Sequence, residues 1–377
     1  MKRIEHLLPS ASIGTQRTLV SIHFGKPDCG RKVYIQAGLH ADEAPGYLVA
    51  TRLVELLTVA EQEGRICGEI IVVPVANPIG LDQWTTDSVQ GRFDRVDNVN
   101  FNRNHLEVAE QAAEKLQGRL GNDPDANTSL IRQVVGEVLS EIRPLGETAF
   151  LKHLLFSMSH DADIVLDLHC DFQAVMHVYT GTALWPEAHD LSAQMGAYAT
   201  LLAAESGGCP FDEANSQIWW LLAEKFPDHP ILPACLAATV ELRGNSDTLP
   251  AQTQQDTANL YTFLQRRGYL AGEAGPVPEL LHDATPLEGV DYIKAEAAGI
   301  LSYLKEPGEI VDEGEVIAKL TDPMAKPGQV AITEISCKTK GVLFARSCDR
   351  FARPGKIVAK VAGTKPLAGK GKQLLTI

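Results

Sequence analysis

The hydrophobic and polar positions of the first two-thirds of the chain follow two alternating patterns. Short, continuous apolar runs predict five buried strands, at 33–38, 69–76, 163–168, 174–179 and 237–242. Stretches with helical periodicity separate them, at about 44–61, 129–142, 148–159, 189–205, 216–224 and 252–267. Buried strands that alternate with helices indicate an α/β fold, with a mixed, largely parallel sheet and helices on both faces.

The pattern changes near residue 275, so residues 1–275 are expected to form one domain. Residues 276–289 are rich in proline and acidic residues and are interpreted as a linker. Over 290–365 the helical patterns stop and short β-like runs recur between glycine-containing turns, which predicts a small all-β barrel, followed by a basic tail at 366–377. A polar, helical stretch at about 106–146 interrupts the alternation and is interpreted as an insertion, either a lid near the site or a surface decoration.

Within the second domain, the stretch GILSYLKEPGEIVDEGEVIAKLTDP resembles biotinyl/lipoyl-type barrel domains. The lysine that those domains modify sits in a motif such as MKM or DKA, and this chain has none; Lys338 and Lys340 lie in CKTKG instead. We therefore expect no covalent cofactor, and an accessory or partner-facing role for the barrel.

Composition and charge exclude several classes of function. The chain of 377 residues has a net charge of −14, which disfavours nucleic-acid binding. No apolar run is long enough to span a membrane, and the first residues show no signal-peptide pattern, so a cytoplasmic protein with no membrane partner is expected. The seven scattered cysteines include no CxxC pair, which argues against both a disulfide framework and a thiolate zinc site.

Two motifs at predicted strand ends carry candidate metal ligands. GLHADEAPG places His40 and Glu43 three residues apart where a strand passes into a helix, and DLHCD places His169 at the end of a buried strand. Imidazole nitrogens and carboxylates are both good Zn²⁺ ligands. Asp167 and Asp171 compete for the role of orienting a ligand histidine. Taken singly, each motif also has an ordinary structural reading, as helix-start acids or a hydrogen-bonded histidine.

Two further motifs carry candidate catalytic and substrate-binding groups. DRVDNVNFNRNH contains Arg95, Asn102 and Arg103. The planar guanidinium groups of the arginines and the amide of the asparagine suit a substrate carboxylate. Such a segment also forms Asx turns in an ordinary loop. TVELRG ends a strand on Glu241, which is either a general base with a raised pKa or an ordinary glutamate paired with Arg243.

In order, the motifs HxxE, NxxG, NRN, DLH and ELxG resemble the succinylglutamate desuccinylase/aspartoacylase family, within the zinc carboxypeptidase superfamily, over about 33–244. The resemblance implies one Zn²⁺ per chain. It also assigns roles to individual residues: His40, Glu43 and His169 as zinc ligands, Glu241 as the base that activates water, Arg95 as the group that polarises the scissile carbonyl, and Asn102 and Arg103 as binders of the substrate carboxylate. One departure is that Ile231 stands where aspartoacylases carry a further arginine, and Arg243 is the candidate replacement.

The expected function is that of a zinc-dependent amidohydrolase, which removes the acyl group from a small N-acyl amino acid by means of a metal-activated water. The partner is then a small-molecule substrate, and family analogy allows a homo-oligomer. Three alternatives stay open: a carboxypeptidase-like zinc peptidase acting on short peptides, a non-catalytic zinc-binding module, and a metal-free acyl transferase that uses Cys170. The sequence leaves the acyl group and the amino acid undetermined.

Overall fold

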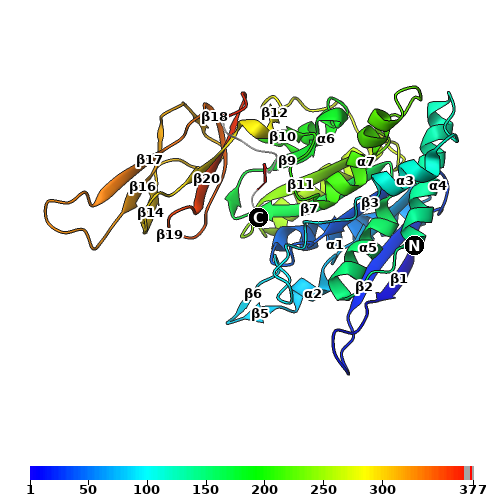
Figure 1. Cartoon of the computed structure of the whole chain (residues 1–377), viewed down its shortest axis with the longest axis horizontal. Helices are drawn as coiled ribbons and strands as arrows, with labels where there is room; N and C mark the ends of the chain where they lie inside the picture. The colour runs from blue at the N-terminus through cyan, green and yellow to red at the C-terminus, as the bar shows by residue number, and fades with distance from the viewer. Residues whose placement is uncertain (369–373, 376–377) are drawn as a thin grey trace.

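The computed structural model describes residues 1–368 and 374–375 (Figure 1). Its main sheet has nine strands in the order β1-β2-β4-β3-β7-β11-β9-β10-β12. Strands β4, β3, β7 and β11 run parallel to one another, whereas β1, β2 and the β11–β9 junction are antiparallel. The strands are β1 (Lys2–Leu7), β2 (Thr18–Gly25), β3 (Lys32–Ala37), β4 (Glu69–Val73), β7 (Ile164–Asp171), β9 (His177–Gly181), β10 (Ala199–Ala203), β11 (Leu236–Gly244) and β12 (Thr285–Pro286).

Helices cover both faces of this sheet, so the mixed α/β fold predicted from the sequence is confirmed. One face packs against α3 (Ala109–Leu116), α4 (Pro124–Glu141), α5 (Glu147–Ser159) and α7 (Phe211–Lys225). The other face packs against α1 (Ala44–Gln62), α6 (His189–Met195) and α8 (Pro250–Arg266). The short α2 (Pro78–Leu81) follows β4. Within the described residues, no helix is both long and apolar enough to cross a bilayer.

The faces are separated by strict alternation along the central strands. On β7, Val165 joins the core under α7, whereas Leu166 and Leu168 join the core under α1. Asp167 and His169 continue the series of Val165 and are buried on its side of the strand. The hydrophobic pattern of the sheet therefore places these polar residues on one face, near the carboxyl ends of the parallel strands.

The prediction of a helix over 189–205 is wrong for the second half of this range. The helix α6 ends at Met195, and the next residue, Gly196, has a φ of 70°, a left-handed conformation that suits glycine and ends the helix. Residues 199–203 then form β10 in the main sheet. The apolar run ATLLA is compatible with either element, and its pairing with β9 decides between them.

The stretch at 106–146 forms α3 and α4, and these helices contribute Leu116, Ile131 and Val138 to the apolar core. None of its residues lines the cavity of the candidate site. The interpretation of this stretch as a lid is therefore not supported. Each helix buries its apolar side in the core, and its polar residues lie on the opposite side.

The C-terminal strands form two sheets that project from the main domain (Figure 1); one has five strands, including one strand contributed by the main domain, and the other has four. The sheet order is β13-β20-β18-β15 in one and β17-β16-β14-β19 in the other. The strands are β13 (Val290–Lys294), β14 (Gly299–Tyr303), β15 (Ile310–Val311), β16 (Val316–Thr321), β17 (Ile332–Ser336), β18 (Gly341–Arg346), β19 (Phe351–Ala352) and β20 (Ile357–Gly363). Leu301, Ile317 and Val361 belong to the apolar core between the sheets.

Two strand pairings join this β domain to the main domain. The short β8 (Gln173–Ala174), which follows β7, pairs with β18. Strand β12, inside the expected linker, pairs with β10 at the edge of the main sheet. Of the expected tail, residues 369–373 and 376–377 lie outside the described residues. Leu374 is buried, and its backbone N–H donates to the carbonyl oxygen of Ser206.

Candidate active site

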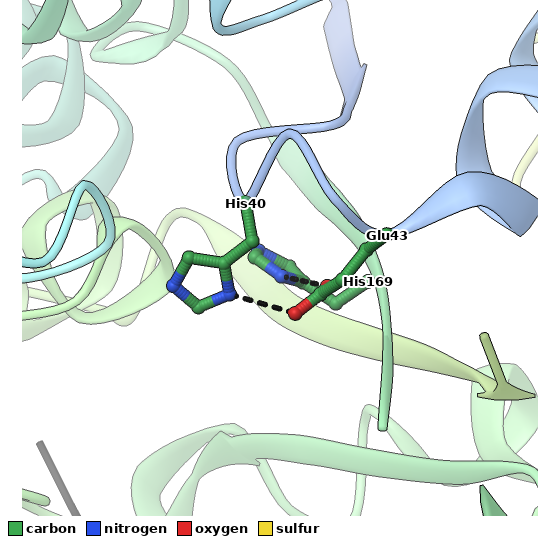
Figure 2. Close-up of side chains that lie close together, drawn as sticks. All are labelled: His40, Glu43 and His169. Carbon is green, nitrogen blue, oxygen red and sulfur yellow. Dashed lines mark hydrogen bonds and ion pairs between the residues drawn. The ribbon is translucent and has the colours of Figure 1, made fainter. Parts of the chain in front are cut away.

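Three candidate metal ligands converge at the carboxyl ends of β3 and β7 (Figure 2). His40 lies on the loop after β3, Glu43 directly precedes α1, and His169 lies on β7. Their ligand atoms all lie within 4.8 Å of one another, and all three side chains are buried. Glu43 bridges the two histidines: its Oε1 is 2.9 Å from Nδ1 of His40 and its Oε2 is 2.8 Å from Nδ1 of His169.

The outer nitrogen of each imidazole is held by an acceptor. Nε2 of His40 lies 2.8 Å from Oδ1 of Asn100, and this oxygen also accepts from the backbone N–H of Asn102, which fixes the orientation of the amide. Nε2 of His169 lies 2.8 Å from Oδ2 of Asp167. Both Nε2 atoms are therefore hydrogen-bond donors, and both Nδ1 atoms face Glu43, an arrangement typical of metal-bound histidines.

Asp167 is in turn held by residues of the neighbouring strand. Gln36 on β3 donates from Nε2 to Oδ1 of Asp167, at 3.0 Å, and its Oε1 accepts from the hydroxyl of Tyr34, at 2.9 Å. All of these side chains are buried. This chain of hydrogen bonds fixes the orientation of the His169 ring. Asp167, rather than Asp171, therefore orients this histidine.

The donor set fits a divalent cation. Burial lowers the pKa of His40 to about 4, so its ring is neutral and, with its proton on Nε2, Nδ1 turns a lone pair toward the Glu43 carboxylate. Two lone pairs at this distance repel each other unless a positive charge stands between or beside them. A guanidinium N–H of Arg92 already lies 3.0 Å from Glu43 Oε1 and 3.2 Å from His40 Nδ1. Two imidazoles and one carboxylate are a donor set that suits Zn²⁺.

Glu241 lies beside this cluster because of the strand register. On β11 it is the partner position of His169 on β7, and on the other side it pairs with His177 of β9. Its Oε2 is buried and has no hydrogen-bond partner within the described part of the chain. Burial and the negative charges of Glu43 and Asp171 raise the pKa of Glu241 to about 8. A carboxyl in this state is suited to exchanging a proton near neutral pH.

The structure brings Arg92, and not Arg95, to the cluster. The guanidinium of Arg95 instead bonds the backbone oxygens of Gln83 and Trp84, at 3.3 and 3.4 Å. Arg92 is placed by Gly91, whose backbone packs so closely on the turn of the first motif that a Cβ would lie 2.5 Å from the backbone nitrogen of Asp42. The close approach requires glycine there and carries the next side chain into the site.

Of the remaining expected site residues, two line the cavity and one does not. Asn102 and Arg103 line the cavity, and Oδ1 of Asn102 accepts from the backbone N–H of Phe211 at 2.8 Å. Arg243 does not line it: the strand register shifts after Glu241, Arg243 has a φ of 65°, and its Nη1 donates to Asp256 on α8 at 3.0 Å. Of the expected arginines, Arg103 lines the cavity, together with Arg92 from just before the expected segment, whereas Arg243 pairs with Asp256 on α8.

A cavity of about 630 Å³ opens from the cluster, and both domains line it. Lys360 on β20 reaches across from the β domain and forms an ion pair with Asp171, the last residue of β7. Arg346 and Lys356 also line the cavity. The β domain is therefore a wall of the site and not a detached accessory module.

Several of these residues were not singled out from the sequence. Asn100 and Arg92 lie in or next to the expected NRN segment, and the glycine before Arg92 was the available signal. Lys360 is 189 residues from its partner, and no local pattern points to it. Asp212 and Glu213, at the start of α7, also line the cavity.

Comparison with known proteins agrees with this geometry. The family of the succinylglutamate desuccinylase/aspartoacylase catalytic domain matches residues 29–217. A curated relative, the N-alpha-acetyl-L-2,4-diaminobutyric acid deacetylase of Halomonas elongata, is 24% identical over 344 residues, which cover 88% of this chain and 82% of the relative.

Solved structures of other proteins have the same fold. A succinylglutamate desuccinylase/aspartoacylase family protein from Shewanella amazonensis has a TM-score of 0.83 and 25% identity, covering 96% of this chain and 98% of that one. The product-bound ectoine utilization protein EutE (DoeB) from Ruegeria pomeroyi has a TM-score of 0.65 and 18% identity, covering 96% and 95%. Fold and site together define a member of a deacylase family: the chain belongs to the succinylglutamate desuccinylase/aspartoacylase family.

Proposed function

We propose that this protein is a zinc-dependent amidohydrolase that removes the acyl group from a small N-acyl amino acid. The observation that carries the proposal is the position of Glu241, a buried carboxyl with a raised pKa, in register with His169 and therefore beside a three-residue ligand set. A general base next to a metal that keeps an open coordination position is the arrangement that hydrolysis by water requires.

His40, Glu43 and His169 would hold the metal, which supplies Lewis-acid polarisation and lowers the pKa of water when it is bound. Glu241 takes a proton from the attacking water at its carboxylate and returns it to the nitrogen of the departing amine. The guanidinium of Arg92 donates to the carbonyl oxygen of the substrate, where negative charge develops. Arg103, with Asn102, binds the carboxylate of the amino acid and fixes its position relative to Glu241.

Two further observations support a small substrate and a metal mechanism. The β domain closes one side of the cavity, which favours a small molecule over an extended peptide and makes the peptidase alternative weaker. Burial and the surrounding carboxylates raise the pKa of the Cys170 thiol far above its usual range, so this cysteine is not a reactive thiolate. The relative from Halomonas is named for removing an acetyl group from an amino acid, so acetyl is the first acyl group to test.

The experiment is metal analysis combined with an amine-release assay on a panel of N-acetyl and N-succinyl amino acids. We expect about one zinc per wild-type chain, loss of zinc in His169→Ala, and loss of hydrolysis but not of zinc in Glu241→Gln. His153→Ala, on α5 away from the cavity, is a matched control that should keep both. Wild-type protein that takes up no zinc on reconstitution, or hydrolyses none of the panel when loaded, would overturn the proposal.

A further inference from the structure

Two leucines close to the end of the chain contribute to the wall of the cavity. Leu374 is only 5% exposed, whereas Leu375 is half-buried and lines the cavity. We call these two residues the C-terminal leucine pair. Neither has a role in the hydrolysis described above, and the sequence pattern predicts only a basic tail in this part of the chain.

The backbone of the C-terminal leucine pair is held by a single carbonyl group. The N–H groups of Leu374 and Leu375 both donate to the carbonyl oxygen of Ser206, at 2.8 and 3.1 Å. Ser206 lies in the loop at 204–210, between β10 and α7, and its own N–H donates to Glu213 on α7 at 2.6 Å. Two donors on one acceptor fix the direction of the chain, so the side chain of Leu375 has a defined place in the cavity.

The side chain of Leu374 anchors the pair in an apolar core to which both domains contribute. This core contains Leu201 on β10, Leu287 directly after β12 and Phe344 on β18. Removing the leucine side chain from water at this junction stabilises the docked position of the chain. The pair is therefore held by its backbone and by one of its two side chains, and the other side chain is left to meet the cavity.

The cavity wall next to Leu375 is apolar. Leu201, Ala203 and Leu287 belong to the core that holds Leu374, and all three also line the cavity. Leu375 packs against the same core. We call the surface formed by Leu201, Ala203, Leu287 and Leu375 the apolar end of the cavity. Such a surface binds the hydrocarbon part of a ligand and has no group that takes part in hydrolysis.

The loop at 204–210 places the apolar end on the amino-acid side of the site. Gly208, two residues after Ser206, packs so closely on Arg103 that a Cβ would lie 2.9 Å from Cδ of the arginine. The N–H of Asn104 donates to the carbonyl oxygen of Gly208 at 2.6 Å. One short loop therefore holds both the leucine pair and the proposed binder of the substrate carboxylate. The apolar end accordingly lies beside the amino-acid half of the substrate and not beside its acyl group.

Anchoring of the tail does not by itself account for Leu375. The burial of Leu374 and the two hydrogen bonds to Ser206 secure the chain whichever side chain follows. A residue that only ended the tail would be free to be polar and to point to solvent, whereas Leu375 completes an apolar surface inside the cavity. Its position is explained by contact with a ligand.

We propose that the C-terminal leucine pair determines substrate specificity, with Leu375 as the wall that limits the length of the amino-acid side chain and Leu374 as its positioning residue. The inference rests on the proposed hydrolysis and names the substrate group that the apolar end receives: the hydrocarbon part of that side chain. A cavity of about 630 Å³ is in the range that holds drug-sized ligands, so a short side chain does not reach this wall and a long one does.

The test compares Nα-acetyl amino acids that differ only in side-chain length, from alanine through norvaline and norleucine to 2-aminooctanoate. A parallel series with ω-aminoalkyl side chains, from ornithine to lysine and its longer homologues, measures the limit for a charged terminus. The wild type should show a length beyond which kcat/KM falls by about 10-fold or more per methylene group, the effect of one methylene in an apolar pocket.

Variants of the pair should move this limit in opposite directions. Leu375→Ala shortens the wall, so the ratio of kcat/KM for long over short substrates should rise by about 10-fold or more, and Leu375→Trp should lower it by a similar factor. Leu374→Ala loosens the anchor and should raise the ratio as Leu375→Ala does. Leu281→Ala is the matched control: Leu281 is 52% exposed, does not line the cavity, and should leave the ratio unchanged.

A binding measurement gives a second readout that does not depend on turnover. The free amino acids of both series should raise the thermal midpoint of the wild type up to the limiting length, and Leu375→Ala should extend this range. A wild type without a length limit, or an unchanged ratio in both Leu375 variants, would overturn the wall and leave the hydrolase intact. If the zinc-loaded protein hydrolyses nothing, the proposed function fails, and the same stabilisation pattern in the wild type and Leu375→Ala would then overturn the wall as well.

Discussion

Glu241 and His169 occupy partner positions on two adjacent parallel strands, β11 and β7. Neighbouring strands lie about 4.8 Å apart, so the sheet itself fixes the separation of the proposed base and the ligand-bearing position. The register changes directly after Glu241, between it and Gly244, and this irregularity turns Arg243 toward α8 and away from the cavity. The base is therefore held on an interior strand of the main sheet, and loops supply Arg92, Asn102 and Arg103.

The first prediction concerns that base. Glu241→Gln keeps the size of the side chain and removes its ability to accept a proton, so kcat should fall by about 10²- to 10⁴-fold. Zinc content should not change, because Glu241 is not one of the clustered ligand residues. Steady-state kinetics and metal analysis on the same preparation check both statements. A variant that retains a tenth of wild-type kcat would assign the proton transfer to another group.

The second prediction separates the two aspartates of the DLHCD motif. Asp167→Asn weakens the hydrogen bond to Nε2 of His169 and should lower zinc affinity by about 10- to 100-fold, the usual effect of losing an outer partner of a ligand histidine. Asp171→Asn is the matched control, because Asp171 pairs with Lys360 and not with a ligand. Competition with a zinc chelator measures both affinities. Equal losses in the two variants would contradict the assignment of Asp167.

The third prediction uses the raised pKa of Asp212. Its folded pKa, about 7, lies above the ordinary value of 3.8, so between these values the unfolded chain binds fewer protons than the folded protein. The contribution of Asp212 to stability is therefore present below about pH 4 and is lost as the pH rises through 7, by at most about 1.4 kcal/mol per pH unit. Asp212→Asn should gain stability relative to the wild type between pH 5 and pH 7.5.

Urea unfolding of the two proteins at both pH values measures this difference, and groups such as Glu241 that are common to both cancel. The exposed Glu224→Gln provides the control, since it should show no such relative change. A constant difference between the wild type and Asp212→Asn across this range would mean that Asp212 is ionised in the folded protein already at pH 5.

Local patterns were sufficient for the central strands and for where the candidate ligands lie. His40 lies after β3 and His169 lies near the end of β7, two buried strands whose apolar runs are unambiguous, and parallel strands bring their carboxyl ends together. The helix predicted over 189–205 failed because ATLLA has no periodicity that separates a strand from a helix, and only pairing with β9 settles it. Strands β1 and β2 were missed for a related reason: β1 is mostly exposed, β2 mixes buried with half-buried positions, and both are mixed in polarity.

Contacts between distant segments could not be predicted from local patterns. The family resemblance assigned the polarising role to Arg95, but the close packing of Gly91 on the turn at Asp42 brings Arg92 to the cluster. Asp212 and Glu213 look like the ordinary polar start of a helix, and only the docking of α7 over the sheet places them in the cavity. The part of the β domain that faces the site depends on the β8–β18 pairing, which joins residues more than 170 positions apart.

The fourth prediction tests the attachment of the β domain. Lys360→Met leaves the carboxylate of Asp171, which is 9% exposed, without its ion-pair partner, so the free energy of unfolding should fall by about 1–3 kcal/mol. Lys340→Met removes a similar ion pair, with Asp312, but both of its side chains are more than 70% exposed, so it should have no measurable effect. Denaturant unfolding compares the two variants. If Lys360→Met is as stable as Lys340→Met, this ion pair does not secure the β domain.

The fifth prediction distinguishes Arg92 from Arg95. Arg92→Ala removes the guanidinium beside Glu43, so kcat/KM should fall by about 10²- to 10³-fold, mainly through kcat, because the donor acts on charge that develops in the transition state. Zinc content should persist, since the lost group is a cation next to the ligands. Arg95→Ala should stay within a few-fold of the wild type, because its guanidinium bonds only the hairpin at Gln83–Thr85. The opposite result, a loss confined to Arg95→Ala, would restore the assignment implied by the family resemblance and would require this loop to rearrange when substrate binds.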